Sequence, residues 1–388
     1  EGCASDGFNS SIKYLLIFLA IIMPVLANPT VDYASPTLGN NTNSTANFTL
    51  INITTNDTLA DYVTLEWNGT NFTVDSPAIV FNMHFNENSS TAITDRSRVG
   101  NNVSTVGGTL FTNSGRFGSA YFFDGSDDRI NGSSVSLPTG NSPRAVCSWF
   151  RTNTGTGNNL IVGWGNTATA SQASNLMIIA GTLYVSTISN DHDSTVNVAD
   201  NAWHQGCWAW DSIASRIYID GILRSTADLT DLSTTITDNT DYLAIGNQNG
   251  EAYWYNDYID EVKIFNRNLS AAEINRSFQA DYGRYNSTLF TINMTDLANG
   301  TYNYRVFINN TANAQNVSTQ RYITIGSPLA TTLTAPVVTI SFPTNGTFAN
   351  NTNYNLTLNW TVSSNVSTTV LCWRYIGITQ IAFSNVTN

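Results

Sequence analysis

The carboxylates of this 388-residue chain are the side chains that could do chemistry, provided that two of them stand in the right place. Hydrolysis of a glycosidic bond uses two carboxyl groups, about 5–10 Å apart, on either side of the bond. Residues i and i+2 of a strand share a face, so such a pair is expected at even spacing. Asp260 and Glu261 are adjacent, as are Asp127 and Asp128, so each pair is predicted to point to opposite faces. We therefore expect no glycosidase pair.

Other catalytic patterns are also missing from the sequence. The three histidines, His84, His192 and His204, do not have the HExxH spacing of a zinc hydrolase. No Gly-x-Ser-x-Gly elbow and no glycine-rich phosphate loop occurs. The prediction is a protein that is not an enzyme.

Two segments have the residue types that bind sugars. Aromatic rings stack on the apolar face of a pyranose, while Asp and Asn side chains hold its hydroxyls. The candidate ligand-binding residues are Asp191, His192, Asp193, Tyr253, Trp254, Tyr255 and Asn256. The alternative is that at least one aromatic residue of the second segment belongs to the hydrophobic core.

Composition narrows the class of partner. Hydrophobic residues make up 41% of the chain, which is enough for a sizeable core, but charged residues only 11%. The net charge is -12, and no Lys/Arg cluster occurs, so the chain lacks the footprint of a nucleic-acid binder. Anionic lipid would repel such a chain.

The N-terminal residues predict export. Lys13 precedes an apolar run at 14–26 that ends before Ala27, which is typical of a secretory signal peptide. The alternative, a membrane anchor, needs about 20 apolar residues, and Pro24 interrupts this run. We expect residues 1–27 to be removed, leaving no membrane span in the mature fragment and an extracellular location. Asn-x-Ser/Thr sequons crowd residues 40–73 and 268–387, and none lies between Asn131 and Asn268.

The cysteines fit this location. Cys147 and Cys207 both lie in strand-like runs, and an oxidising compartment permits a disulfide between them. The alternative is two buried free thiols. Cys3 precedes the cleavage point, and Cys372 has no evident partner.

Short runs bounded by Gly, Asn, Asp and Pro predict an all-β chain. Residues 30–74 and 286–326 each supply only part of an immunoglobulin-like sandwich, so we expect one such domain split by an insertion at 75–284. The alternative is two independent modules with small cores. A linker at 327–335 and a partial immunoglobulin-like domain at 336–388 follow. Tyr302 resembles the tyrosine of such sandwiches whose hydroxyl bonds to upstream backbone.

Within 75–284, one short helix and several core residues are predicted. Ser270 and Glu273 form a capping box, followed by Ile274 and Phe278 at helical spacing. Alternation with polar neighbours places Trp149, Trp203 and Phe265 in the core.

Residues 78–282 also resemble the laminin-G-like branch of the concanavalin A-like lectin/glucanase superfamily. The motifs that carry this resemblance occur in the family's order: HFNE at 84–87, GRFGSA at 115–120, FFDGSDD at 122–128, CSWF at 147–150, WH at 203–204, IYIDG at 217–221 and YIDEVKIFNR at 258–267. The resemblance implies a central jelly roll flanked by the immunoglobulin-like modules.

The resemblance further implies a structural calcium ion. Its ligands would come from the turn that contains Asp95 and Asn101 and from the closing-strand Asp260. Arg98 and Val99 depart from the Gly- and Asn-rich turn of the family, and nearby arginines raise the cost of a divalent cation. The alternative is that Asp95 caps a turn and that Asp260 accepts from backbone amides.

Three functions fit these features. The first is a cell-surface binding or adhesion protein whose jelly roll binds a glycan or a protein. The second is a structural cell-envelope glycoprotein without a specific ligand. The third is an accessory region of a larger secreted glycoside hydrolase. The sequon-rich Thr/Asn segments resemble those of archaeal surface proteins.

Overall fold

The computed structural model describes residues 28–57, 60–237, 242–248 and 253–326. It also gives the backbone of four further strands, which pair two by two: β26 (Val337–Phe342), β27 (Asn359–Ser363), β28 (Trp373–Ile376) and β29 (Thr379–Ala382). About 51% of the chain is strand and 3% is helix, so the all-β prediction is confirmed.

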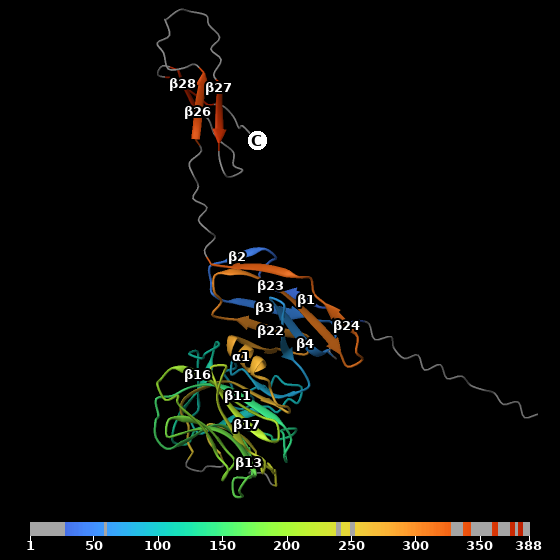
Figure 1. Ribbon diagram of the computed structural model, residues 1–388, viewed down its shortest axis with the longest axis vertical. Helices are drawn as coiled ribbons and strands as arrows, with labels where there is room; N and C mark the ends of the chain where they lie inside the picture. Colours follow the sequence, from blue (N-terminus) through green and yellow to red (C-terminus); the bar gives the residue numbers. More distant parts are fainter. Residues whose placement is uncertain are drawn as a thin grey trace, which may run out of the picture.

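The central part of the chain forms two large antiparallel sheets (Figure 1). The first has seven strands, in the spatial order β15 (His192–Asn197), β14 (Thr182–Ser186), β13 (Ala173–Ile179), β12 (Asn158–Gly165), β19 (Leu243–Ile245), β10 (Arg129–Gly132) and β7 (Val103–Val106). The second has eight, in the order β18 (Ile222–Asp228), β17 (Ala214–Ile219), β16 (Trp203–Trp210), β11 (Arg144–Arg151), β20 (Asn256–Phe265), β9 (Ala120–Asp124) and β8 (Leu110–Thr112), with β6 (Ile79–Met83) also paired to β20.

One hydrophobic core lies between these two sheets. Phe150, Trp208 and Ile264 reach it from the eight-stranded sheet, and Leu176 and Leu183 reach it from the seven-stranded sheet. Burial of each such side chain stabilises the fold by about 1.5–3 kcal/mol relative to exposure. The two sheets are therefore held face to face by non-directional packing.

The segments on either side of the jelly roll form a second unit. One of its sheets contains β1 (Asp32–Ala34), β3 (Thr49–Thr54), β22 (Leu289–Met294) and β21 (Ala280–Arg284). The other contains β2 (Thr42–Ser44), β25 (Arg321–Ile325), β23 (Gly300–Asn310), β4 (Ala60–Trp67) and β5 (Thr70–Asp75), with β24 (Gln315–Val317) paired to β23. Figure 1 shows the blue N-terminal strands interleaved with the orange strands of the later segment.

This flanking unit has a single core to which both segments contribute, including Ile51, Leu65, Phe290 and Val306. β21 lies within the range 75–284, which we assigned to the jelly roll, yet it pairs with β22 of the flanking unit. The Tyr302 hydroxyl donates to the Ala298 carbonyl oxygen at 2.8 Å, as its resemblance to a tyrosine corner predicts.

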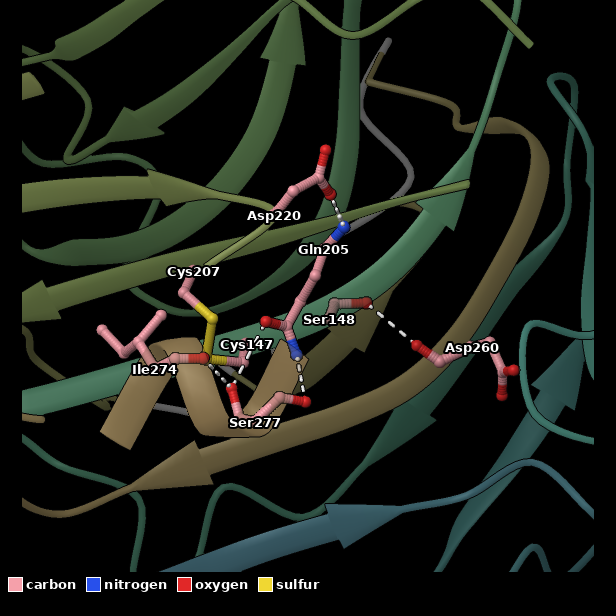
Figure 2. The surroundings of a disulfide bond; sticks show 8 residues. All are labelled: Cys147, Ser148, Gln205, Cys207, Asp220, Asp260, Ile274 and Ser277. Carbon is pink, nitrogen blue, oxygen red and sulfur yellow. Dashed lines mark hydrogen bonds between the residues drawn. A yellow bond between two sulfur atoms is a disulfide. The ribbon is translucent and has the colours of Figure 1, made fainter. Parts of the chain in front are cut away.

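The predicted helix is present as α1 (Ala271–Gln279), and its capping box between Ser270 and Glu273 is complete. Figure 2 shows α1 lying over a disulfide that joins Cys147 on β11 to Cys207 on β16. Gln205 fixes the helix to the sheet, because its amide donates to the Ser277 carbonyl oxygen at 3.0 Å. The part of the outer face that carries the disulfide is therefore buried beneath α1.

Two of the three predicted core residues are buried, since Trp149 is 3% exposed and Phe265 is 4% exposed. The prediction for Trp203 is wrong, because this side chain is only half-buried. Trp203 is the first residue of β16 and pairs with Arg151 of β11. Trp149 lies two residues before Arg151 on β11, and its ring stacks on Phe278 of α1. Alternation identified the face of the sheet correctly but not how far the helix extends over it.

Arginines tie the jelly roll to the flanking unit. Asp75, at the end of β5, accepts from Arg98 at 3.0 Å and from Arg284 at 2.9 Å. Arg96 donates to the Tyr285 carbonyl oxygen at 2.7 Å. Arg98, which sets this turn apart from the family pattern, is therefore used at the junction between the two units.

Several predictions fall outside the described residues: the signal peptide at 1–27, the linker at 327–335, the partner of Cys372 and the side chains of 336–388. Among the residues that are described, no helix has the length and apolar character needed to cross a membrane.

Replacing both Cys147 and Cys207 by Ala should lower the free energy of unfolding. The bond closes a loop with a sequence separation of 60, and loop-closure entropy puts its contribution at about 4 kcal/mol. Urea unfolding of the full chain measures this loss. The reduced wild type is the control and should match the double variant, whereas equal stability of the reduced and oxidised protein would contradict the prediction.

Candidate functional site

The outward face of the seven-stranded sheet carries a group of apolar side chains. A sheet face exposed to water usually carries polar ones. On β13, Leu176 and Ile178 enter the core, while Met177 between them points to the other side. Tyr184 on β14 does the same between Leu183 and Val185. The residues that pack together on this outward side are Leu160, Met177, Ile179, Tyr184, Tyr242, Ala244 and Tyr253, and we call this cluster the tyrosine face.

The register of the strands explains why these side chains meet. Leu160 pairs with Met177, and Met177 pairs with Tyr184, so three neighbouring strands place them in one row. Tyr253 joins this row because its carbonyl oxygen accepts from the Leu160 amide at 2.9 Å. Tyr184, Tyr242 and Tyr253 remain half-buried, so each ring keeps part of its surface open to solvent.

Acidic and amide groups border the tyrosine face. Asp193 continues the row, since it pairs with Tyr184. Burial, and then the negative charges of Asp193 and Asp191, raise the pKa of the Tyr184 hydroxyl. Asn175 lies two residues before Met177 on the same face, and its buried side-chain oxygen accepts no hydrogen bond from the described residues. Hydrogen-bonding groups therefore stand beside apolar rings, which is the arrangement of a ligand site.

The first predicted sugar-binding segment is divided between the two sides of the sheet. Asp191 and Asp193 lie near Tyr184, and the Asp191 carboxylate also accepts from the Ser186 hydroxyl at 2.9 Å. His192 is 5% exposed, and its ring nitrogens lie 2.8 Å from the Ser215 hydroxyl and 2.9 Å from the Ser225 hydroxyl. His192 is therefore held inside the protein, away from the tyrosine face.

The second predicted segment is divided in the same way. Tyr253 belongs to the tyrosine face, and Trp254 is half-buried. Tyr255 is fully buried, and its hydroxyl donates to the Arg151 carbonyl oxygen at 2.9 Å. Asn256 begins β20 in the eight-stranded sheet, opposite Asp124. The structure thus brings Asp191, Asp193 and Tyr253 to one face and places His192, Tyr255 and Asn256 elsewhere.

Sequence reasoning missed Tyr184, Tyr242, Met177 and Asn175. A signal for Asn175, Met177 and Tyr184, though not for Tyr242, exists in the run NLMIIAGTLYVS at 175–186, where apolar residues occur at consecutive rather than alternate positions. An antiparallel hairpin with this pattern carries apolar groups on both of its faces.

The residues predicted to bind calcium have other hydrogen-bonding partners. Asp95 is 4% exposed, and its two oxygens accept four hydrogen bonds, from the Asn82 amide, the Ser97 amide and hydroxyl, and the Asn101 amide, at 2.8–2.9 Å. Asp260 accepts from the amides of Phe117 and Glu261 at 3.0 and 2.9 Å. These are the hydrogen bonds of the turn-capping alternative, and the calcium site stays a prediction.

The prediction that Asp260 and Glu261 point to opposite faces is wrong. Glu261 has a φ of 51°, and the register shifts between its neighbours, so β20 carries a bulge here. The bulge turns both carboxylates outward, Asp260 to the Phe117 amide and Glu261 to His84 at 2.8 Å. Both are almost fully buried, at 0% and 3% exposure, so a glycosidic bond could not reach them.

Replacing Asp95 by Ala should destabilise the protein by roughly 2–4 kcal/mol, because buried donors lose their acceptor. The expected loss is the same with calcium and with chelator, since the carboxylate caps a turn. Chemical unfolding of the full chain under both conditions measures it, with Asp193→Ala on the sheet surface as the control. A loss that appears only with calcium would restore the calcium site.

Comparison with known proteins agrees with this architecture. Residues 124–275 match a family model described as the concanavalin A-like lectin/glucanases superfamily. No curated protein matches the chain. The fold resembles domain 4 of AbnA, a GH43 extracellular arabinanase from Geobacillus stearothermophilus solved with arabinotriose, at 15% identity and a TM-score of 0.41, over 52% of this chain and 98% of that one.

Two toxin domains are similar at the same level. The binding domain of Paraclostridial Mosquitocidal Protein 1 has 18% identity and a TM-score of 0.41, over 52% of each chain. The binding domain of botulinum neurotoxin serotype D/C has 13% identity and a TM-score of 0.41, over 79% of this chain and 73% of that one. At this similarity they say nothing about the ligand. The family match and the two packed antiparallel sheets confirm the predicted concanavalin A-like jelly roll for the central part of the chain.

Proposed function

We propose that this protein is an extracellular cell-surface binding protein whose jelly roll binds a glycan on the tyrosine face. The observation that carries the proposal is the group of three half-buried rings, Tyr184, Tyr242 and Tyr253, with Asp193 paired to Tyr184. Tyrosine rings offer an apolar surface to the faces of sugar rings, and the adjacent Asp193 carboxylate accepts hydrogen bonds from hydroxyls.

The electrostatics of this face favour a neutral or basic glycan over an acidic one. Asp191 and Asp193 act on Tyr184, and the chain as a whole is acidic, with a net charge of -12. A carboxylated or sulfated sugar would be repelled at this position, because like charges close to one another destabilise a complex. Neutral oligosaccharides are the first class to test.

The flanking unit then serves as a spacer. The shared core of residues 31–74 and 280–325 supports a single immunoglobulin-like domain into which the jelly roll is inserted. Its contacts through Asp75, Arg98 and Arg284 would hold the tyrosine face at a set orientation relative to that spacer.

Replacing Tyr184 by Ala should weaken glycan binding at least about tenfold, because a stacked aromatic ring is lost. A glycan array with the full chain identifies the ligand, and calorimetry then compares the variants. Tyr184→Phe keeps the ring and should bind nearly as well. Tyr62→Ala removes a tyrosine that is 46% exposed on the flanking unit and should bind as the wild type does.

The outcomes separate the competing functions. Equal glycan affinity of the wild type and Tyr184→Ala would mean that the glycan binds outside the tyrosine face. No binding to any glycan, with the protein folded, would favour a structural envelope protein or a protein ligand.

A further inference from the structure

Five ionisable side chains meet where the jelly roll joins the flanking unit. Asp260, Glu261 and Lys263 come from β20, His84 follows β6, and Asp281 comes from β21. We call this group the junction cluster. It lies on the opposite side of the jelly roll from the tyrosine face and does not depend on the function proposed there.

Three of these groups converge on one point. The His84 Nδ1 atom lies 2.8 Å from a Glu261 carboxylate oxygen and 3.1 Å from the Asp281 Oδ1 atom. One nitrogen and two oxygens, each from a different side chain, thus lie within 4.8 Å of one another. Bonds of 2.0–2.1 Å to a tetrahedral zinc ion place its ligand atoms roughly 3.3–3.4 Å apart. The two distances from the His84 Nδ1 atom, 2.8 and 3.1 Å, are a few tenths of an ångström short of that spacing.

The two carboxylates offer more hydrogen-bond acceptors than the His84 ring has hydrogens to donate. A neutral His84 ring has one hydrogen at Nδ1, which can point at only one of the two carboxylates. The Asp281 Oδ1 atom is buried, and its contacts with His84 at 3.1 Å and with Lys263 at 3.6 Å lack the geometry of a hydrogen bond. A cation among the three atoms would satisfy all of them.

The charges of the cluster balance with a divalent ion. When His84 is neutral, the carboxylates of Asp260, Glu261 and Asp281 contribute three negative charges, and Lys263 contributes one positive charge. The remaining two negative charges are costly in a buried site, because uncompensated ions lose their hydration. One divalent cation neutralises them.

Without a metal ion, bound protons neutralise these negative charges. Burial opposes a charged ring, but the carboxylates of Glu261 and Asp281 outweigh it and raise the pKa of His84 to about 10. Burial, and then the neighbouring Glu261 carboxylate, raise the pKa of Asp260 well above its usual range.

A neighbouring amide can hold the His84 ring in place, and a crevice connects the group to solvent. Asn82 is 2% exposed, its amide nitrogen lies 3.3 Å from the His84 Nε2 atom, and its side-chain oxygen accepts no hydrogen bond from the described residues. A half-turn of this amide would present that oxygen to the Nε2 proton, as partners of metal-binding histidines do. A crevice of about 70 Å³, lined by His84 and Asp281, leads to the group from solvent.

From this geometry we propose that His84, Glu261 and Asp281 form a site for a divalent transition-metal ion, with zinc as the best match to one imidazole and two carboxylates. The ion replaces the proton on His84 Nδ1 and leaves one coordination position toward the crevice. Because Glu261 belongs to the jelly roll and Asp281 to the flanking unit, the ion links the two units.

Lys263 competes with this ion. Its ammonium lies 3.0 Å from the same Glu261 oxygen that approaches His84, and 3.6 Å from Asp281. Removing the ammonium frees that oxygen and removes a repelling charge, so Lys263→Met should bind the metal more tightly than the wild type.

Calorimetric titration with zinc chloride at neutral pH tests the proposal, using the full chain purified without a histidine tag and stripped of metal by chelator. The wild type should bind one zinc ion at the cluster. His84→Gln and Asp281→Asn should each weaken binding by at least about a hundredfold, since even outer partners of metal ligands are worth about 10- to 100-fold. Asp281→Asn preserves the side-chain shape and serves if His84→Gln does not fold.

His204→Gln is the matched control. His204 is exposed to a similar extent, 16% against 14%, and also lies between two carboxylates, those of Asp220 at 2.8 Å and Asp200 at 3.1 Å. These carboxylates approach opposite ring nitrogens, so one metal ion could not contact all three groups. Zinc binding should be unchanged in this variant.

Three results would overturn the proposal. They are a wild type that takes up no zinc, equal losses in His84→Gln and His204→Gln, and a Lys263→Met variant that binds no more tightly than the wild type. The last would mean that the ion binds elsewhere, since a remote site would not respond to Lys263.

Discussion

Charge burial at the junction is the constraint on which the arrangement of the two units depends. β20 is paired with β11 on one side and with β9 and β6 on the other, and one of its faces supplies the core of the jelly roll. Its other face carries Glu261 and Lys263 to Asp281 of the flanking unit. Buried charges are tolerated only when they are paired, so these groups specify how the units meet.

The two outward faces of the jelly roll consequently have different environments. On the outer face of the eight-stranded sheet, α1 and β21 cover the region that holds the disulfide and the charged residues of the bulge. The tyrosine face of the seven-stranded sheet keeps three half-buried rings open to solvent. These exposed parts of the rings are where binding is expected, because their burial by a ligand removes apolar surface from water.

Much of the fold could be predicted from local patterns. The capping box of α1 and the hydrogen bond of Tyr302 depend on residues a few positions apart, so spacing alone reveals them. The candidate site was harder. Asp193 and Tyr253 were identified by residue type, but Tyr184 lies on a strand that reads as ordinary core, and only the pairing of β13, β14 and β15 shows its outward direction.

The sequence by itself determined the class of the protein: an all-β chain with a lectin-like central part, a split flanking segment and no linear catalytic motif. The tertiary structure alone decided which side chains meet. The bulge at Glu261 reversed the expected direction of a carboxylate, and His84, 177 residues away, became its partner. The reason is physical. Alternation follows from the geometry of one strand, whereas a bulge and a long-range contact depend on how neighbouring strands and units pack.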